Sequence, residues 1–508
     1  MNKDQETQNS EKTMDSQSER YEHLGGIRQL LLFFMVAMVQ IMVQVTLSQV
    51  PSLPLPGFFH IEENLGKQSW LALSMPLTTA AFMLPAGKLG DLYTYKRLIV
   101  IGYAIVGFGA LMVGFTGYVE NLVYFSIFRG VTGIGFACTL PNFLSLANTI
   151  YPATSFKRLI MMVTFSTSAM IGFFGGLMVS AVVAERIWWP WAFWIAAIIA
   201  ILLSIANYLI IPDGVDTYCT ERVPFDFIGT ALYSPSIIIL VAMMVQGAAA
   251  GWKQNPYTYI IFIVGCLLFG ACMIYEIKFC KYPLIHRGIF TSETAFVLLC
   301  MLCGWAGFGI WLFNTGRFDQ LIVGSTPVVA ALHYLPVIPS GIISVTLAII
   351  SLQKLPVPLL MLVSLCSFLV SNILVGTRPV HQTYWAQNFI SVIILPFAID
   401  FSLPTGGIIL SSLVPNTEVG AASSIVLTAA FLAVTIGFAI GTNAEVYTTI
   451  GKPQSIETLT QAIRNSFHVA FAINGLGVIV AFIFVIYSLA YLKKYSSPTQ
   501  SSEKNQIV

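Results

Sequence analysis

The sequence predicts an all-α polytopic membrane protein with fourteen membrane spans. Of its 508 residues, 56% are hydrophobic and only 9% are charged, whereas a soluble domain normally carries about 25% charged residues. Apolar runs of roughly 20 residues recur along the chain, and each is long enough to cross a hydrocarbon core of about 30 Å as a helix. The net charge of +2 favours neither nucleic acid nor an acidic partner.

The apolar runs place fourteen spans between two polar tails. Two of them, the tenth and the twelfth, are interrupted by Pro336, Pro339, Pro396 and Pro404, which a membrane helix tolerates where neighbours or water satisfy the freed carbonyl groups. The spans are expected at roughly 28–50, 69–86, 98–117, 121–145, 158–183, 189–212, 227–247, 257–276, 293–314, 327–352, 356–376, 387–412, 420–442 and 467–491.

Lysine and arginine are distributed unevenly between the two sides of the predicted bundle. With the N-terminus inside, 17 of the 25 fall in inside segments, 7 fall in outside segments, and Arg129 lies within a span. Because cytoplasmic loops of membrane proteins are enriched in these residues, the bias predicts that both termini are cytoplasmic. It also favours an even number of spans. The polar segment 213–225 forms a natural seam between the two halves.

The connection between spans 2 and 3 combines glycines with charges. Gly87 and Gly90 permit a tight turn and a close approach of helices. Asp91 precedes the basic pair Lys96 and Arg97, and a carboxylate near the start of the next helix is stabilised by the helix dipole. An ordinary cytoplasmic loop would also explain the two basic residues, but it does not explain the whole spacing.

Span 4 contains a charged residue, Arg129, followed by Gly133 and Gly135. An arginine inside a span is costly unless it is paired or hydrated, so it indicates a functional site. The alternative is an arginine whose head reaches the membrane interface. The two glycines give a small-residue face for close helix packing.

Four further polar residues fall inside apolar runs. Gln40 and Gln44 share one helix face because they are four residues apart. They and Asn142 either line a substrate path or form hydrogen bonds with neighbouring helices. Asp400 is the acidic residue placed deepest in a span, among apolar neighbours, and it is the candidate for proton coupling. The alternative is that Asp400 stabilises the helix break expected from Pro396 and Pro404.

These motifs resemble signatures of the major facilitator superfamily. The loop signature G-x-L-a-D-r-x-G-r-[RK]-[RK] is matched at Gly87, Leu89, Gly90, Asp91, Lys96 and Arg97, and it departs at Thr94, where the family usually has glycine. The span-4 signature R-x-x-x-G-x-G-x-A is also matched, and its arginine is associated with proton coupling in the family. In span 5 the antiporter motif G-P-x-x-G-G is matched at Gly175 and Gly176 but lacks its Gly-Pro pair, which leaves the direction of transport open.

Further stretches, which begin at Trp188, Asp226, Gly324, Tyr384, Asp400 and Val414, narrow the resemblance to the 14-span drug:proton antiporter family. They resemble most its fungal aminotriazole-resistance subgroup, which includes boron exporters. The resemblance covers roughly residues 28–492. It departs in span 1, where the family's acidic residue is missing and Val39 and Gln40 stand instead.

The resemblance implies two six-helix bundles and two additional spans. The expected parts are a disordered cytoplasmic tail at 1–27, a first bundle at 28–212, a seam with two inserted spans at 213–292, a second bundle at 293–492 and a cytoplasmic tail at 493–508. Proton coupling or gating is expected of Asp91, Lys96, Arg97, Arg129 and Asp400. A structural role is expected of Gly87, Gly90, Gly133, Gly135, Gly175 and Gly176.

The implied function is proton-coupled export of small toxic or drug-like compounds, such as aminotriazole or boron, by alternating access. The alternatives are uptake or facilitated transport of a small polar solute and, less favoured, a transporter-like sensor. The expected partners are the substrate, protons and the lipid bilayer, with no oligomer required, and the plasma membrane is favoured over the vacuolar membrane. No G-x-x-x-x-G-K-[ST] loop for ATP occurs. No cluster of His, Asp, Glu or Cys has ligand spacing, so no enzyme activity, cofactor or metal site is predicted.

Overall fold

The structure is a computed structural model that describes residues 26–151, 156–212, 224–285, 287–289, 291–411, 419–453 and 455–495. Within these ranges every regular element is a helix, and fourteen helical segments are long and apolar enough to cross a membrane. The predicted all-α architecture with fourteen spans is confirmed. The tails at 1–25 and 496–508, and most of the seam, at 213–223, lie outside the described residues.

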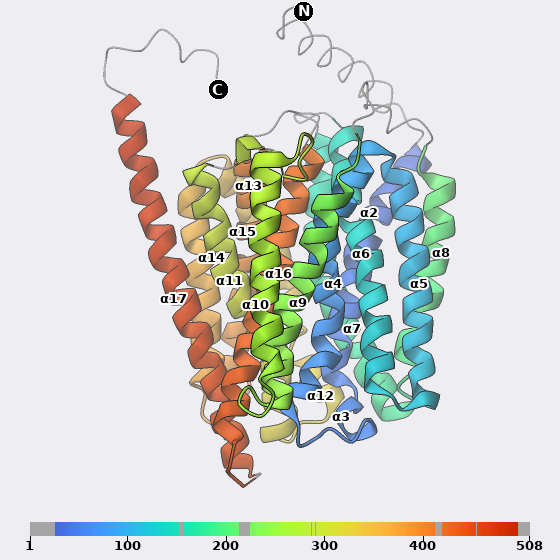
Figure 1. Ribbon diagram of the computed structural model, residues 1–508, viewed down its shortest axis with the longest axis vertical. Helices are drawn as coiled ribbons and strands as arrows, with labels where there is room; N and C mark the ends of the chain where they lie inside the picture. The colour runs from blue at the N-terminus through green and yellow to red at the C-terminus, as the bar shows by residue number, and fades with distance from the viewer. Residues whose placement is uncertain are drawn as a thin grey trace, which may run out of the picture.

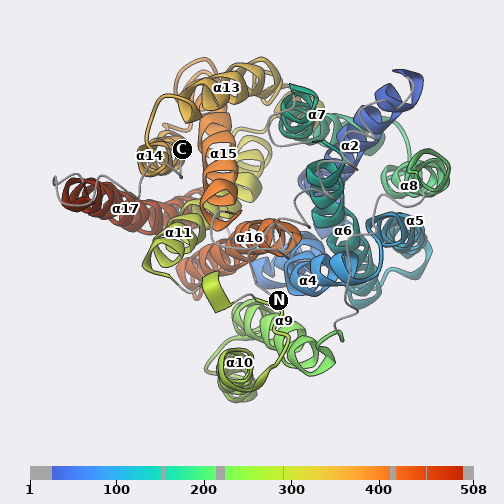
Figure 2. The same cartoon turned by 90° about the horizontal axis from the view of Figure 1, so that it is seen from above.

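The helices fall into two groups and an inserted pair (Figures 1 and 2). The first bundle consists of α2 (Gly26–Ser48), α4 (Leu65–Leu92), α5 (Tyr95–Val119), α6 (Leu122–Ile150), α7 (Phe156–Arg186) and α8 (Trp191–Ile210), with the short η1 (Val50–Ser52) and α3 (Leu55–Phe58) after α2. The inserted pair is α9 (Phe227–Ala250) and α10 (Tyr257–Ile274), which is continued by the π-helical turn η2 (Tyr275–Phe279); the short η3 (Arg287–Ile289) follows.

The second bundle begins with α11 (Ser292–Arg317) and the π-helical turn η4 (Phe318–Ile322). It continues with α12 (Pro327–Leu332), α13 (Val337–Leu352), α14 (Val357–Gly376), α15 (Gln387–Ser411), α16 (Val419–Thr449) and α17 (Ile456–Tyr495). Figure 2 shows that α4 and α16 meet between the two groups, and that α9 and α10 lie outside them on the α4–α16 side.

The first helix begins and the last helix ends at the same end of the molecule (Figure 1). We call this the terminal end, and we call the opposite end, where α3 and α12 lie, the distal end. The shared end agrees with an even number of spans.

The outer surface of the bundle is apolar, as α8 illustrates. Ile198, Leu202, Ile205 and Leu209 lie on one stripe of this helix, and each is exposed. The opposite face buries small residues, including Ala196 and Ala200, against the bundle. A helix that is apolar on both faces fits a bilayer, because lipid covers the outward stripe.

Two boundaries differ from the predicted spans in a way that affects the site. The segment between the predicted spans at 420–442 and 467–491 is mostly helical, because α16 runs to Thr449 and α17 begins at Ile456. The opening helix of the second bundle, α11, also continues past residue 314, through Arg317 and into η4. Polar side chains in these extensions bind one another, so the helices do not end where the apolar runs end.

The prolines act differently in the two interrupted spans. Span 10 breaks at residues 333–336 into α12 and α13, with Pro336 directly before α13. Span 12 is the continuous helix α15 despite Pro396 and Pro404. Proline has no N–H group, so Pro404 leaves the backbone carbonyl of Asp400 without its usual helical partner.

Candidate functional site

A central cavity lies between the two bundles and spans about 880 Å³ of space not filled by atoms, which includes space open to solvent. Helices from both bundles line it: α2, α6 and α7 from the first, and α11, α13, α15 and α16 from the second. Polar side chains are few in this lining and consist of Gln40, Gln44, Ser166 and Asp400. A mostly apolar cavity with a few convergent polar groups is the usual form of a small-molecule site.

The structure brings together three of the residues that the sequence singled out. Gln40 and Gln44 face the cavity from α2, and Asp400 faces it from α15 in the other bundle. Asn142 is not part of this lining. Its side-chain amide donates hydrogen bonds to the backbone oxygens of Ala86 (3.2 Å) and Cys138 (2.7 Å), so the helix-packing alternative describes its contacts.

Asp400 is 4% exposed, and its Oδ2 atom has no hydrogen-bond partner. No ion pair recorded among the described residues includes it. Ser344 of α13 lies beside the carboxyl group. The carboxyl group therefore stands in the cavity wall without a fixed cation, next to the helix position that Pro404 loosens.

Aromatic side chains make up much of the cavity wall, and no signal in the sequence distinguished them from core residues. Phe165 and Phe173 come from α7, Trp305 and Phe308 from α11, and Phe431 from α16. The indole Nε1 of Trp305 donates a hydrogen bond to Ser402 Oγ (3.1 Å). Ser402 lies half a helical turn after Asp400 on α15. This bond holds the indole against the helix that carries the cavity carboxyl group.

Arg129 is fully buried inside the first bundle. One guanidinium nitrogen donates to the backbone oxygen of Thr46 (2.9 Å), and the guanidinium lies 5.7 Å from the ring centre of Phe193. Thr46 belongs to the last turn of α2, whose carbonyl groups lack helical partners and carry the negative end of the helix dipole. Arg129 therefore caps the helix that presents Gln40 and Gln44.

The connection between α4 and α5 is short and capped. Thr94, the departure from the family signature, is the N-cap of α5, and its hydroxyl accepts a hydrogen bond from the backbone N–H of Arg97 (3.2 Å). Asp91 accepts a hydrogen bond from the hydroxyl of Tyr95 (2.8 Å). The Lys96 ammonium group lies 5.1 Å from the ring centre of Tyr208 in α8, and Arg97 is exposed. These contacts join the connection to the first bundle.

Most of the glycines chosen from the sequence lie at close helix contacts. A Cβ atom on Gly90 would stand 1.6 Å from Asn142 Oδ1, and one on Gly133 would stand 2.2 Å from the backbone oxygen of Met75. Gly135 is similarly close to Gly102, and Gly176 is close to Val45 and Ser48 in α2. Gly175 has open space at the Cβ position.

Gly87 differs from these glycines because its neighbour belongs to the other bundle. A Cβ atom there would lie 1.9 Å from Oγ and 2.9 Å from Cβ of Ser424 in α16. Near the distal end of the same helix pair, Ser69 and Thr442 share a hydrogen bond of 2.9 Å. Helices α4 and α16 therefore pack closely towards both ends of their shared length.

Gly87→Ala is expected to reduce transport severalfold, because the added methyl group separates α4 from α16 in the state described. Overpacking of this kind costs about 1–3 kcal/mol. Ser424→Gly in the same chain should restore most of the transport by vacating the space. Initial rates at matched surface expression check this, and Gly175→Ala is the control with open space. Full activity of Gly87→Ala alone would contradict a tight contact.

Contacts between the bundles close the distal end of the cavity. The Gln320 side chain donates to the backbone oxygen of Pro51 (3.0 Å), and the Val328 N–H donates to Glu185 Oε1 (3.0 Å). The ring of Tyr334 lies 5.6 Å from that of Phe173, edge to face. Each pair joins the second bundle to the first on the distal side of the cavity.

A buried charge cluster supports this closure from within the second bundle. Asp319, in η4, accepts hydrogen bonds from Arg378 (2.5 Å) and Asn388 (3.2 Å) and pairs with His333 Nδ1 (3.0 Å). The Tyr384 hydroxyl donates to the backbone oxygen of His333 (2.7 Å). Burial, followed by the Asp319 charge, raises the pKa of Tyr384 to about 12, so this hydroxyl keeps its proton.

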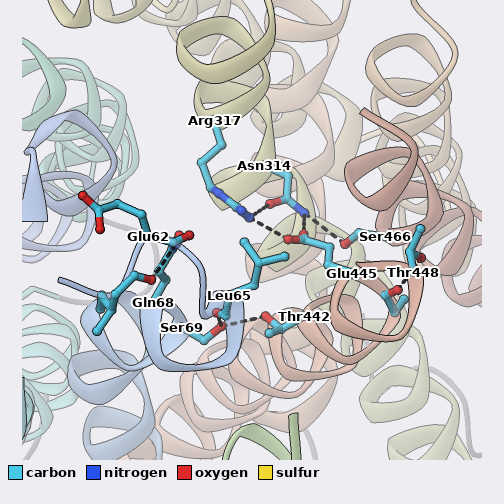
Figure 3. A network of polar contacts seen from close by, with 12 residues as sticks. Glu62, Leu65, Gln68, Ser69, Asn314, Arg317, Thr442, Glu445, Thr448 and Ser466 are labelled. Carbon is cyan, nitrogen blue, oxygen red and sulfur yellow. Dashed lines mark hydrogen bonds and ion pairs between the residues drawn. The ribbon is translucent and has the colours of Figure 1, made fainter. Parts of the chain in front are cut away.

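A second buried carboxylate, Glu445, lies in the extension of α16 (Figure 3). It is 1% exposed and binds Arg317 (2.8 Å) and the side-chain amide of Asn314 (2.7 Å), which also donates to Ser466 (2.9 Å). Asp400 is therefore not the only carboxylate within the bundle. Asp319 and Glu445 escaped the sequence analysis because they lie beyond the predicted apolar runs.

No cluster with metal-ligand spacing is visible in the sequence, but the fold brings three residues of ligand type together. Asp226, Glu276 and Cys280 bring one ligand atom each to within 4.8 Å of the others. They lie in the inserted pair and not in the cavity wall.

A match to a family model establishes the family to which the chain belongs. The model described as Major Facilitator Superfamily matches residues 30–351, which is more than half of the chain. The chain belongs to the major facilitator superfamily. It is therefore a membrane transporter of small molecules rather than an enzyme.

Fungal relatives of this superfamily match the chain over most of its length. A low affinity ammonium transporter of Saccharomyces cerevisiae is 33% identical, over 92% of this chain and 90% of its own length. The efflux pump terJ of Aspergillus terreus is 31% identical (97% and 94%), and the aminotriazole resistance protein of S. cerevisiae is 29% identical (86% and 82%). The expected resemblance to the drug-efflux subgroup is confirmed.

Solved structures of major facilitator proteins share the fold. A peptide transporter crystallised with sulfate aligns with a TM-score of 0.63 at 14% identity, over 94% of this chain and 98% of its own. At this identity the likeness concerns the fold alone.

Proposed function

We propose that this major facilitator protein is a proton-coupled antiporter that exports small toxic or drug-like compounds by alternating access. The observation that carries the proposal is the Asp400 carboxyl group, which is buried in the cavity wall with one oxygen unpartnered. A carboxyl group that is ionised in one facing state and protonated in the other would couple the proton gradient to the exchange of states. Binding near the midplane between two bundles suits such an exchange.

The proposed orientation places both termini and the terminal end in the cytoplasm, in the plasma membrane. The excess of lysine and arginine in the segments on that side supports it. The distal end then faces the outside, and the contacts that close it describe a state turned away from the outside. A state of this kind suits an exporter that takes up its cargo from the cytoplasm.

Gating is assigned to the α4–α5 connection together with Arg129. Asp91, Lys96 and Arg97 follow Gly87, which contacts the second bundle at the terminal end. Movement of α16 away from Gly87 would therefore first change the contacts of this connection. Arg129 would keep α2 fixed to α6 during the movement, because it bonds the end of α2.

The cavity lining favours apolar cargo with one or two polar groups. Aromatic rings supply much of the wall, and Gln40, Gln44 and Asp400 supply places for a hydrogen bond or a positive charge. The names of two similar proteins, an efflux pump and an aminotriazole resistance protein, support export of toxic compounds.

Uptake of a small polar solute is the second candidate, and one observation favours it. A relative at 33% identity is named a low affinity ammonium transporter. Ammonium would need the carboxyl group of Asp400 but little of the aromatic wall. The missing Gly-Pro pair of the span-5 motif also leaves the direction of transport open.

Expression in a yeast strain that lacks ammonium transporters and drug exporters separates the two candidates. If the protein is an exporter, cells that express it should grow in the presence of aminotriazole or of another compound from a toxin panel that includes boric acid. These cells should also accumulate less of that compound. They should show no gain in methylammonium uptake. Growth on low ammonium with no resistance to any compound would replace export by uptake.

A further inference from the structure

The inserted pair carries a compact group of three side chains at the terminal end of the molecule. Asp226 is the N-cap of α9, and its Oδ1 atom accepts a hydrogen bond from the backbone N–H of Gly229 (2.9 Å). Glu276 lies in the π-helical turn η2, and Cys280 follows directly after that turn. The group therefore joins the start of one inserted helix to the end of the other.

The three side chains face a common point. Cys280 Sγ lies 3.2 Å from Asp226 Oδ2, and one ligand atom from each residue lies within 4.8 Å of the other two. Gly229 lies beneath this point. A Cβ atom there would stand 2.2 Å from Asp226 Oδ2 and 2.4 Å from Glu276 Oε1, so a larger residue would collide with both carboxyl groups.

Glu276 provides the observation that calls for a ligand. Its side chain is 2% exposed, and its Oε2 atom accepts a hydrogen bond from the backbone N–H of Leu284 (2.9 Å). Its Oε1 atom, which faces Asp226 and Gly229, has no hydrogen-bond donor. A carboxylate oxygen buried without a donor or a cation is costly.

The negative charges of the two carboxylates make the group unstable without a compensating charge. No ion pair recorded in the described part of the chain includes Asp226 or Glu276. Two carboxylates beside each other in a buried site repel unless a cation or a shared proton lies between them. A shared proton between the two carboxyl groups would not need a third residue. The thiol of Cys280 beside them therefore favours a cation, for which sulfur is a ligand.

We propose that Asp226, Glu276 and Cys280 bind one Zn²⁺ ion. Two carboxylate oxygens and one thiolate suit zinc, which accepts oxygen and sulfur ligands in tetrahedral sites, and water would complete the fourth position. Thiolate excludes Mg²⁺ and Ca²⁺ as the preferred ions, because these take oxygen ligands. The ion would fasten α9 to η2, and it would be structural, since the site lies outside the transport cavity.

The test uses the purified full-length protein in detergent with Co²⁺ as a spectroscopic probe for Zn²⁺. We expect one equivalent of Co²⁺ to produce a sulfur-to-cobalt charge-transfer band that Zn²⁺ abolishes. Cys280→Ser should remove the band, and Glu276→Gln should weaken Co²⁺ binding. The matched control is Cys272→Ser, because the Cys272 thiol donates to the Gly229 backbone oxygen (3.8 Å) in the same helix pair but lies outside the group. This variant should keep the band.

Thermal unfolding gives a second readout that does not depend on the cysteine variant being stable. Zn²⁺ should raise the Tm of the wild-type protein and of Cys272→Ser, whereas Mg²⁺ should not. In Glu276→Gln the rise should be smaller. A charge-transfer band that survives in Cys280→Ser would indicate an adventitious ion only. No band and no Zn²⁺-dependent change in Tm would mean that the two carboxyl groups share a proton, and either result overturns the proposal.

Discussion

Arg129→Ala is expected to lose transport by about tenfold or more, while Arg129→Lys keeps part of it. The alanine variant removes the charged hydrogen bond to the Thr46 carbonyl and leaves the last turn of α2 uncapped. Hydrogen bonds to charged groups contribute about 1.5–3 kcal/mol, and 1.4 kcal/mol corresponds to about a tenfold change in an equilibrium. A lysine still offers a positive donor, although it lacks the planar fork of arginine.

Initial rates of transport at matched surface expression measure this effect. Phe193→Leu is the companion variant, because it removes the aromatic ring beside the guanidinium and keeps the bond to Thr46. We expect Phe193→Leu to stay within a fewfold of the wild type. Equal and full activity of the alanine and lysine variants would mean that the buried charge has no role in transport.

Asp400→Asn is expected to keep substrate binding and to lose the dependence of transport on a pH gradient. Asparagine retains the shape and the hydrogen-bonding oxygen of the side chain but cannot exchange a proton. The variant should therefore still exchange labelled for unlabelled substrate across a membrane. Ser344→Ala is the matched control, because Ser344 lies beside the carboxyl group and its replacement leaves that group able to titrate.

The sequence predicted the fold well because the fold depends on signals that are local in the chain. Each apolar run predicts its own span. The uneven distribution of basic residues between the two sides predicted that the chain starts and finishes on one side, and the first helix begins and the last helix ends at the same end of the molecule. Cavity-facing residues were predicted where polarity contrasts with an apolar run, as at Gln40, Gln44 and Asp400. The aromatic wall gave no such contrast, since phenylalanine and tryptophan also face lipid and core.

Partners across the bundle could not be predicted from single positions. Arg129 was expected to be paired or hydrated, and its partner is a backbone carbonyl, a group that every residue possesses. Glu445 pairs with Arg317, 128 residues away, and this pair extends two helices beyond their apolar runs. Asp226 and Cys280 meet although 54 residues separate them, so no ligand spacing was visible in the sequence.

Proteoliposomes that contain the purified protein and an imposed pH gradient test the central claim most directly. The compound identified by the toxin screen serves as substrate, and its accumulation is measured with and without the gradient. We predict that the gradient drives accumulation by the wild type and by Ser344→Ala, and that it has no effect on Asp400→Asn, which still catalyses exchange at equilibrium. Full gradient-driven accumulation by a folded Asp400→Asn variant would contradict the assignment of proton coupling to this cavity carboxyl group.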